Sequence, residues 1–279
     1  MACVRVQHLP ARRTARLPSN RPRRRRTYSR RRDRLARVVL PIALAAFSQT
    51  AWAVDASDYL LLPTVIQGER EIDWRTGIAS SGSTANAQTD YALGLGYGVT
   101  AHWFTEVAVH YGQRQGSTLQ FKDVAWENIL QLSEPGEWPV DVGIAFEIEH
   151  SQASQDQMNV TAGALMQKEF GLVQVNFNFL VTHVIEGTET AATRVHYQGQ
   201  LKYRYSEPLE FGIQAFGNVS SCCTTWASYP EQVHRLGPVA LGKFKFARER
   251  SLSYNAAFLF GTTHSSPDRT LRFQIEYEF

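Results

Sequence analysis

The sequence has no apolar run long enough to cross a membrane as a helix. Its one marked run, residues 38–47, has ten residues and contains Pro41, whereas a membrane-spanning helix needs about 20 apolar residues. A bundle of membrane helices is therefore excluded. Cysteine is also scarce, with Cys3 in the leader and Cys222 and Cys223 adjacent in a polar loop. A disulfide between neighbours is strained and easily reduced, so we interpret these two as an incidental loop pair or an intermolecular bridge.

Acidic residues are nearly absent from the first 37 residues, which hold 14 of the 29 Lys and Arg but only one acid, Asp33. The remaining residues carry 15 bases and 25 acids, a net charge of −10. Because the part that can fold is acidic, nucleic acid is excluded as a partner. The basic stretch precedes the apolar run and the small-residue site Ala51-Trp52-Ala53. This order predicts a basic leader and secretory signal peptide over residues 1–53.

Motifs for cofactors are absent as well. The sequence has no phosphate-binding loop, no Cys-x-x-Cys pair and no dinucleotide fingerprint. Glu106, His110 and Asp123 are able to face one interior together, but their spacing is not that of a metal site. We therefore expect no cofactor and no metal.

A period of two dominates the exported chain, residues 54–279. In the last nine residues every odd position from Leu271 to Phe279 is apolar and every even position is polar. Such alternation predicts a strand with one apolar and one wet face. Similar stretches of nine to twelve residues recur, for example around Tyr91, Val140, Val173 and Val195. Soluble strands average five or six residues, whereas strands that cross a bilayer at a tilt need about 9–11.

We predict an all-β fold, a single up-and-down antiparallel transmembrane β-barrel of about twelve strands, with ten or fourteen left open. The strands are expected near residues 70–80, 89–99, 103–113, 118–132, 139–150, 157–169, 172–184, 192–205, 209–218, 232–246, 251–261 and 269–279. Two of them fit less well, because Asp123 and Glu127 interrupt one and Pro238 lies inside another. Every second link is short, and the others are mostly longer and polar, as in outer-membrane barrels.

An even strand count places both ends of the barrel on the side of the short links, with residues 54–69 as a periplasmic lead-in. Aromatic side chains gather near the same links, where rings with an apolar body and a polar edge suit the membrane interface. The expected periplasmic aromatic girdle comprises Tyr97, Trp103, Trp138, Tyr205, Phe246 and Tyr277.

The closing segment resembles the carboxy-terminal assembly signal of bacterial outer-membrane barrels, carried here by Phe273, Ile275, Tyr277 and Phe279. The exported chain as a whole resembles bacterial outer-membrane β-barrel proteins of porin type. Its opening, Tyr59 to Pro63 followed by Glu69-Arg70-Glu71, resembles uncharacterised barrels grouped with phenol-degradation-pathway outer-membrane transporters. The resemblance implies a location in the cell outer membrane with both termini periplasmic, contact with outer-membrane lipids and the barrel-assembly machinery, and passage of small solutes, aromatic ones included.

Charged residues on the wet face of such strands must line an interior, since a lipid-facing Arg or Lys at mid-depth costs about 2–4 kcal/mol. The predicted lumen-lining charged residues are Glu71, Asp73, Arg75, Asp141, Glu147, Glu149, Arg194, His196, Lys202, Arg204, Arg272 and Glu276. Four of the bases lie on the strand at 192–205, nearly opposite acids at the two ends of the chain. Opposed basic and acidic walls would orient dipolar solutes in a narrow channel.

The function expected is a passive channel or transporter for small polar or aromatic solutes, and not an enzyme. Two alternatives stay open. The charges can instead pair with one another and close the barrel, leaving a structural or binding barrel whose loops contact a partner. A rim hydrolase would need a serine nucleophile beside a histidine such as His183 or His264, and no matching nucleophile motif is present. The solute and the oligomeric state do not follow from the sequence.

Overall fold

The computed structural model describes residues 57–279 except for 82, 153–156, 188–192, 223–224 and 248–249. The predicted leader and signal peptide, residues 1–53, lies outside the described residues, and so do Cys223 and the side chain of Cys222. Within the described part of the chain, no helix is long and apolar enough to cross a membrane.

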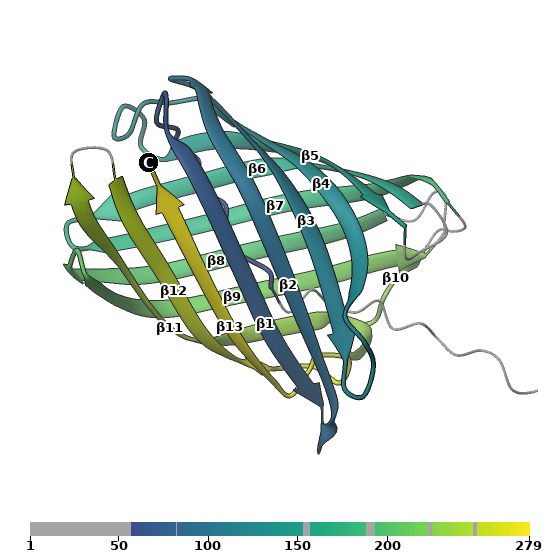
Figure 1. Cartoon of the computed structure of the whole chain (residues 1–279). Helices are drawn as coiled ribbons and strands as arrows, with labels where there is room; N and C mark the ends of the chain where they lie inside the picture. Colours follow the sequence, from purple (N-terminus) through teal and green to yellow (C-terminus); the bar gives the residue numbers. More distant parts are fainter. Residues whose placement is uncertain (1–56, 82, 153–156, 188–192, 223–224, 248–249) are drawn as a thin grey trace, which may run out of the picture. The chain divides into compact units, whose positions relative to one another are not determined.

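Twelve long antiparallel strands follow one another around a closed ring (Figure 1). They are β1 (Arg70–Ser81), β2 (Ser83–Thr100), β3 (Trp103–Arg114), β4 (Gln120–Gln131), β5 (Asp141–Ser151), β6 (Gln157–Phe170), β7 (Val173–Glu186), β8 (Thr193–Ser206), β9 (Leu209–Cys222), β11 (Val233–Ala247), β12 (Arg250–Gly261) and β13 (Arg269–Glu278). A two-residue strand, β10 (Thr225–Trp226), pairs antiparallel with the end of β9, and a short 3-10 helix, η1 (Tyr229–Glu231), precedes β11.

The ring closes where the sequence predicts, between the first and last long strands. In the β1–β13 ladder Trp74 pairs with Ile275, and the Phe279 N–H donates to the Arg70 carbonyl at 2.9 Å. The Trp74 and Phe273 rings meet edge to face with centroids 6.0 Å apart. Because every long strand has two neighbours, no unpaired sheet edge is left, as a sheet exposed to hydrocarbon requires. The predicted closed twelve-strand barrel is confirmed.

The period of two reverses the usual arrangement of a soluble protein. Large apolar side chains are exposed on the outer face of the ring, as Leu95 (62% exposed) and Ile213 (51%) illustrate. Polar and charged side chains are buried on the inner face, among them Asp90, Gln214 and Arg272. This inside-out pattern is the one expected of a barrel surrounded by lipid.

The two irregular strands are accommodated in different ways. In β4 a register shift opposite His110 and Tyr111 absorbs one extra residue, a β-bulge, and Asp123 and Glu127 both stay on the inner face, buried. In β11 the register with β12 is the same on both sides of Pro238, which pairs only with β9. Proline is tolerated because the ladder toward β12 lacks pairs at this one place.

Two strand boundaries differ clearly from the sequence prediction. The second strand begins at Ser83 and not near residue 89, and β9 ends at Cys222 and not near residue 218. Residues 83–88 contain no large apolar residue, so periodicity does not detect this part of the second strand. The hairpin that it forms with β1 extends beyond the apolar band of the wall.

The barrel has two different rims. We call the rim that holds Arg70, Phe279 and the short links the terminal end, and the opposite rim the loop end. The aromatic residues predicted as a girdle lie near the terminal end, and most are well exposed, from Trp103 (36% exposed) to Tyr205 (67%). Phe170 joins them at 63% exposed. Contact of this belt with lipid headgroups stays a prediction.

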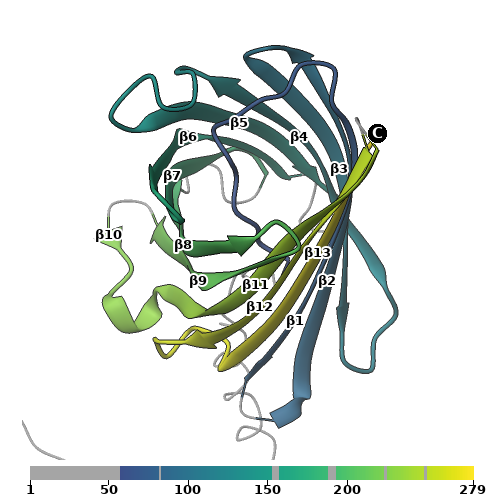
Figure 2. The ribbon, with the colours of Figure 1, turned by 90° about the vertical axis from the view of Figure 1, so that its left-hand side faces the viewer.

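The lead-in differs from its expected position. Instead of lying outside the barrel, residues 57–65 lie in the interior and contact side chains of the inner wall. Figure 2 shows this segment, in dark blue, crossing the space that the strands enclose. The contacts described below explain this position, since the wall offers the segment both apolar and hydrogen-bonding partners.

Candidate functional site

The interior of the ring is the candidate site. The twelve charged residues singled out from the sequence all lie on inner-face positions. Asp73, Arg75, Asp141, Arg194 and Arg272 are buried; Glu71, Lys202, Arg204 and Glu276 border the cavity described below; and Glu147, Glu149 and His196 occupy inward positions of β5 and β8. A role of any of them in solute passage stays a proposal.

Acids concentrate where the barrel closes. In the β1–β13 ladder Glu71 pairs with Glu278 and Asp73 pairs with Glu276, so four carboxyl groups stand on the inner face of two adjacent strands. Like charges directly opposite one another destabilise a sheet. Fold stability therefore does not explain why acids are placed together here, which indicates a functional role for this wall. We call these four residues the acidic seam.

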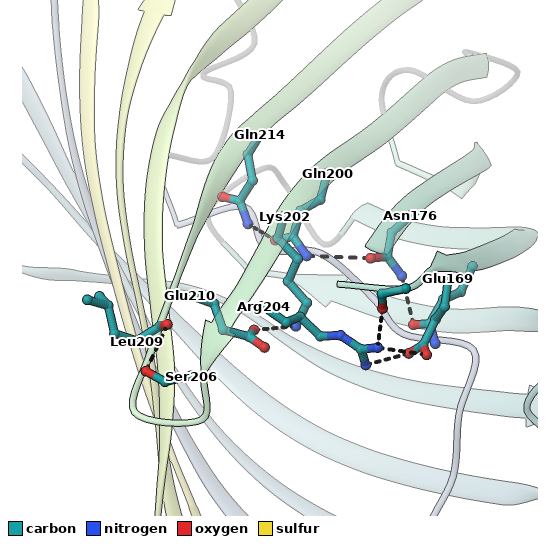
Figure 3. Close-up of polar contacts among 11 residues, drawn as sticks. Glu169, Asn176, Gln200, Lys202, Arg204, Ser206, Leu209, Glu210 and Gln214 are labelled. Carbon is teal, nitrogen blue, oxygen red and sulfur yellow. Dashed lines mark hydrogen bonds and ion pairs between the residues drawn. The ribbon is translucent and has the colours of Figure 1, made fainter. Parts of the chain in front are cut away.

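Two basic residues of β8, Lys202 and Arg204, each have an acidic partner close by (Figure 3). Lys202 Nζ donates to Glu210 Oε2 of β9 at 2.7 Å. Arg204 makes a bidentate pair with Glu169 at 2.7 and 2.9 Å and also reaches the Gly171 carbonyl. Since the field of a paired base is largely cancelled, the expected contrast between a basic and an acidic wall is reduced.

A band of side-chain amides separates these ion pairs from the middle of the lumen. Gln214 donates to Gln200 at 2.6 Å, and Asn176 donates to Gln167 at 2.9 Å (Figure 3 shows three of the four). Arg272 donates to Gln214 at 2.7 Å. This wall, on β6 to β9, is polar without net charge. The sequence periodicity places these amides inward but gives no information on their partners.

Near mid-depth, Arg75 is the centre of a buried ionic group. It contacts Asp73 at 2.9 Å and Glu106 at 2.7 Å. Its guanidinium lies over the Tyr59 ring, 3.7 Å from the centroid, and the Tyr59 hydroxyl donates to Glu127 at 2.6 Å. One guanidinium therefore serves two carboxylates and a lead-in ring.

The lead-in is anchored by Leu61. This side chain is 5% exposed and packs in a recess of the wall with Phe104, Ile129, Ala145, Leu165 and Leu180, to which Tyr59 and Val65 add contacts. We call it the Leu61 recess. A second apolar cluster, Phe216, Val239, Ala257 and Leu259, lies on the inner faces of β9, β11 and β12.

Side-chain amides bind the backbone of the lead-in beside this recess. The Leu61 N–H donates to Gln198 Oε1 at 3.2 Å, and Asn178 donates to the Leu61 carbonyl at 2.9 Å. Further along, the Val65 N–H donates to Gln131 at 2.7 Å. At the other end of the segment, Asp58 forms an ion pair with Arg235. The wall thus holds this stretch of backbone as a bound peptide, without strand pairing.

Two glycines of the wall, Gly98 and Gly143, allow the lead-in to approach it closely. A Cβ at Gly98 would collide with the carbonyl oxygen of Ile66, and this contact is fixed because Gly68 N–H donates to the Gly98 carbonyl at 2.8 Å. A Cβ at Gly143 would lie 3.0 Å from Pro63 Cα. Glycine at these places admits the close backbone approach.

A cavity of about 630 Å³ remains in the terminal half of the lumen, beside the lead-in. Its lining combines the acidic seam with Glu69, Glu106, Glu127, Glu207 and Glu210, the bases Lys202, Arg204 and Lys243, and apolar surface from Leu60, Leu62, Ile66, Leu241 and Tyr254. Lys243 is itself paired with Glu278, at 2.7 Å. Carboxyl groups therefore outnumber bases around the cavity, and each of the three bases already has a carboxylate partner.

One acid at the terminal end has an unusual affinity for its proton. Burial and the neighbouring Glu278 carboxylate raise the pKa of Glu69, which directly precedes β1, to about 7. The charge at this end of the cavity consequently changes close to neutral pH.

No other chemistry emerges in the described part of the chain. No group of three or more His, Cys, Asp or Glu residues there is arranged to hold a metal ion, and His110 contacts Asp123. His183 contacts the Thr193 hydroxyl at 3.0 Å on the outer face, and His264 is exposed in a loop.

Sequence reasoning missed several residues that shape the lumen. Glu127 and Glu210 lie inward at alternating positions of their strands, so periodicity was able to find them, as it did Glu106. The Leu61 recess was not detectable, since its members come from β3 to β7 and each reads as an ordinary small or apolar residue at an inward position.

No protein-family model and no curated protein matches this sequence. Solved structures match its fold. An outer-membrane channel from Pseudomonas putida F1 superposes with a TM-score of 0.50 and 13% identity, over 81% of this chain and 98% of that chain. The NanC porin superposes with a TM-score of 0.51 and 10% identity, over 75% of this chain and 98% of that chain. Together with the closed ring and its inside-out surface, these matches show that the chain has the fold of the bacterial outer-membrane β-barrel proteins.

Proposed function

We propose that this protein is a passive channel of the outer membrane for small solutes, with a preference for cations. The observation that carries the proposal is the cavity of about 630 Å³ inside a closed ring whose outer face is apolar. A barrel of twelve strands is wider than the eight-strand barrels that side chains fill, and narrower than a 16-strand porin. Only small solutes fit such a lumen.

The cation preference follows from the charges around the cavity. Three bases line it, and each of them has a carboxylate partner. Within the described part of the chain, two salt bridges reach the acidic seam, from Arg75 to Asp73 and from Lys243 to Glu278. Rings of Asp and Glu are the means by which cation channels select their ions.

The apolar part of the lining suggests the kind of solute. Leu60, Leu62 and Ile66 from the lead-in and Tyr254 from β12 border the same cavity as the acids. We propose that small solutes with an apolar or aromatic body pass along this side. Amines with such a body suit both surfaces at once.

A selectivity measurement tests the proposal. The refolded protein is inserted in planar bilayers across a KCl gradient, and the sign of the reversal potential is expected to report K⁺ passing more readily than Cl⁻. The double variant Glu210→Gln, Glu278→Gln removes the carboxylates that compensate Lys202 and Lys243 and should shift the potential toward zero. Glu137→Gln, in an exposed turn at the terminal end, is the matched control and should leave it unchanged. Anion selectivity of the unchanged protein would contradict the proposal.

A closed structural or binding barrel is the second candidate, and the pairing of the lumen bases favours it. It would give no current in any variant and no swelling of liposomes in sugars, amino acids or amines. We assign no enzymatic activity. We also propose that the terminal end faces the periplasm, that the Phe273 to Phe279 segment is read by the barrel-assembly machinery, and that the aromatic girdle contacts lipid headgroups.

A further inference from the structure

The lead-in is bound to the inner wall by the kinds of contact that hold a peptide ligand. Leu61 fills an apolar recess, and its N–H and carbonyl both bond to side-chain amides, Gln198 and Asn178. Tyr59 reaches Glu127 and stacks on Arg75. Residues 57–66 form no strand with the barrel, so releasing them breaks no sheet ladder.

The way the segment is attached permits its release. It joins the wall covalently only at β1, where Gly68 and Glu69 pair with Gly98 by backbone hydrogen bonds of 2.8 and 2.9 Å. If the signal peptide is removed after Ala53, as the sequence predicts, only three residues precede Ser57. Such a short free end can leave through the terminal mouth without being threaded through the barrel.

We propose that the inner wall carries a recognition site for an extended peptide with a leucine-sized side chain, and that the lead-in fills this site in cis as a displaceable plug. The site consists of the Leu61 recess with Asn178, Gln198 and Gln131. The proposal rests on the channel function proposed above. It adds that the lead-in closes the channel and that an extended peptide competes with the lead-in for the same site. We expect this site to bind short extended peptides in which an apolar side chain enters the recess and the backbone N–H and carbonyl of the same residue are free to bond to the side-chain amides.

A deletion and its rescue in trans test the proposal. A variant that lacks residues 57–66 should show a several-fold higher unit conductance than the intact chain in planar bilayers. A synthetic peptide of residues 57–66 should return the conductance of this variant to the intact level. The same peptide with Leu61→Asp is the control and should have no effect at the same concentration.

Point variants keep the test valid if the deletion does not fold. Leu61→Asp introduces a charge in the apolar recess and should release the lead-in, with higher conductance. Gln67→Asp adds the same charge to an exposed residue of the lead-in that borders neither the recess nor the cavity, and should retain the intact conductance. Both variants add one negative charge to the lead-in, so a difference between them reports the recess.

The outcomes separate the two proposals. Equal conductance of the intact chain, the deletion variant and Leu61→Asp overturns the plug and leaves the channel. Conductance of the deletion variant that the peptide does not lower overturns the recognition site. A silent intact chain with a conducting deletion variant supports both proposals. Silence of every variant, although each migrates as a folded barrel before boiling, overturns the channel and the plug with it.

Discussion

At the scale of single residues, small side chains shape this lumen as much as charged ones. β2 presents Gly94, Gly96 and Gly98 inward, and the space that they leave receives Glu106, Phe104 and the lead-in backbone. The outward positions between them are apolar. The alternation was enough to predict which face each residue of β2 takes. It did not predict which groups fill the space beside the inward glycines.

Gly98→Ala is expected to displace the base of the lead-in, because the new Cβ would meet the Ile66 carbonyl oxygen, a backbone atom that cannot rotate away. Unit conductance should rise, as for Leu61→Asp. Gly199→Ala is the matched control, since a Cβ there finds its nearest neighbour at 3.9 Å, an ordinary contact. An unchanged conductance in Gly98→Ala would show that the backbone contact does not position the lead-in.

Glu69 makes the selectivity depend on pH near neutrality. Its pKa is raised to about 7 by burial and by Glu278, so its carboxyl is mostly protonated at pH 6 and mostly ionised at pH 8. Cation preference should therefore increase as the pH rises through 7. Reversal potentials at a series of pH values measure this, and Glu69→Gln should remove the step. A step of the same size in Glu69→Gln would assign it to another group.

The sequence did not reveal which side chains of the lumen pair with one another. Lys202 and Arg204 were correctly placed inward, but their partners Glu210 and Glu169 follow from the barrel's register and tilt, which bring β6 and β8 to the same rim. The positive field expected from the bases of β8 was consequently overestimated.

At the scale of elements, the strands were predictable because lipid outside and water inside impose the same period on each of them. Most of the expected boundaries lie within two residues of the observed ones. The exceptions have local causes. The start of β2 has no large apolar residue that periodicity could detect, and the end of β9 reaches Cys222 through two serines where a loop was expected from residue 219.

An outward substitution should cost more in the middle of a strand than at its end. Leu93→Arg places a guanidinium on the outer face of β2 further from the girdle residue Tyr97, where the expected loss is about 2–4 kcal/mol, falling to about 0–1 kcal/mol near the interface. Leu132→Arg, just past the end of β4 at the terminal end, is the control. Chemical unfolding in lipid bilayers gives both free energies. Equal costs at the two sites would contradict the placement of the apolar band.

At the scale of the whole molecule, the closed ring was predictable and its occupied lumen was not. Closure follows from a general requirement, that no backbone group stays unpaired in hydrocarbon. The lead-in has no period, and its partners lie on strands from β1 to β13. Only the folded ring brings Arg235, Glu127 and the Leu61 recess around one short segment.

The central claim is that water and small ions pass along the axis of this ring once its lead-in is out of the way. Single-channel recording of the variant without residues 57–66, refolded and checked by its shifted migration before boiling, tests this claim most directly. We expect discrete current steps with a reversal potential of cation sign. A membrane that stays silent with the folded variant present would contradict the account.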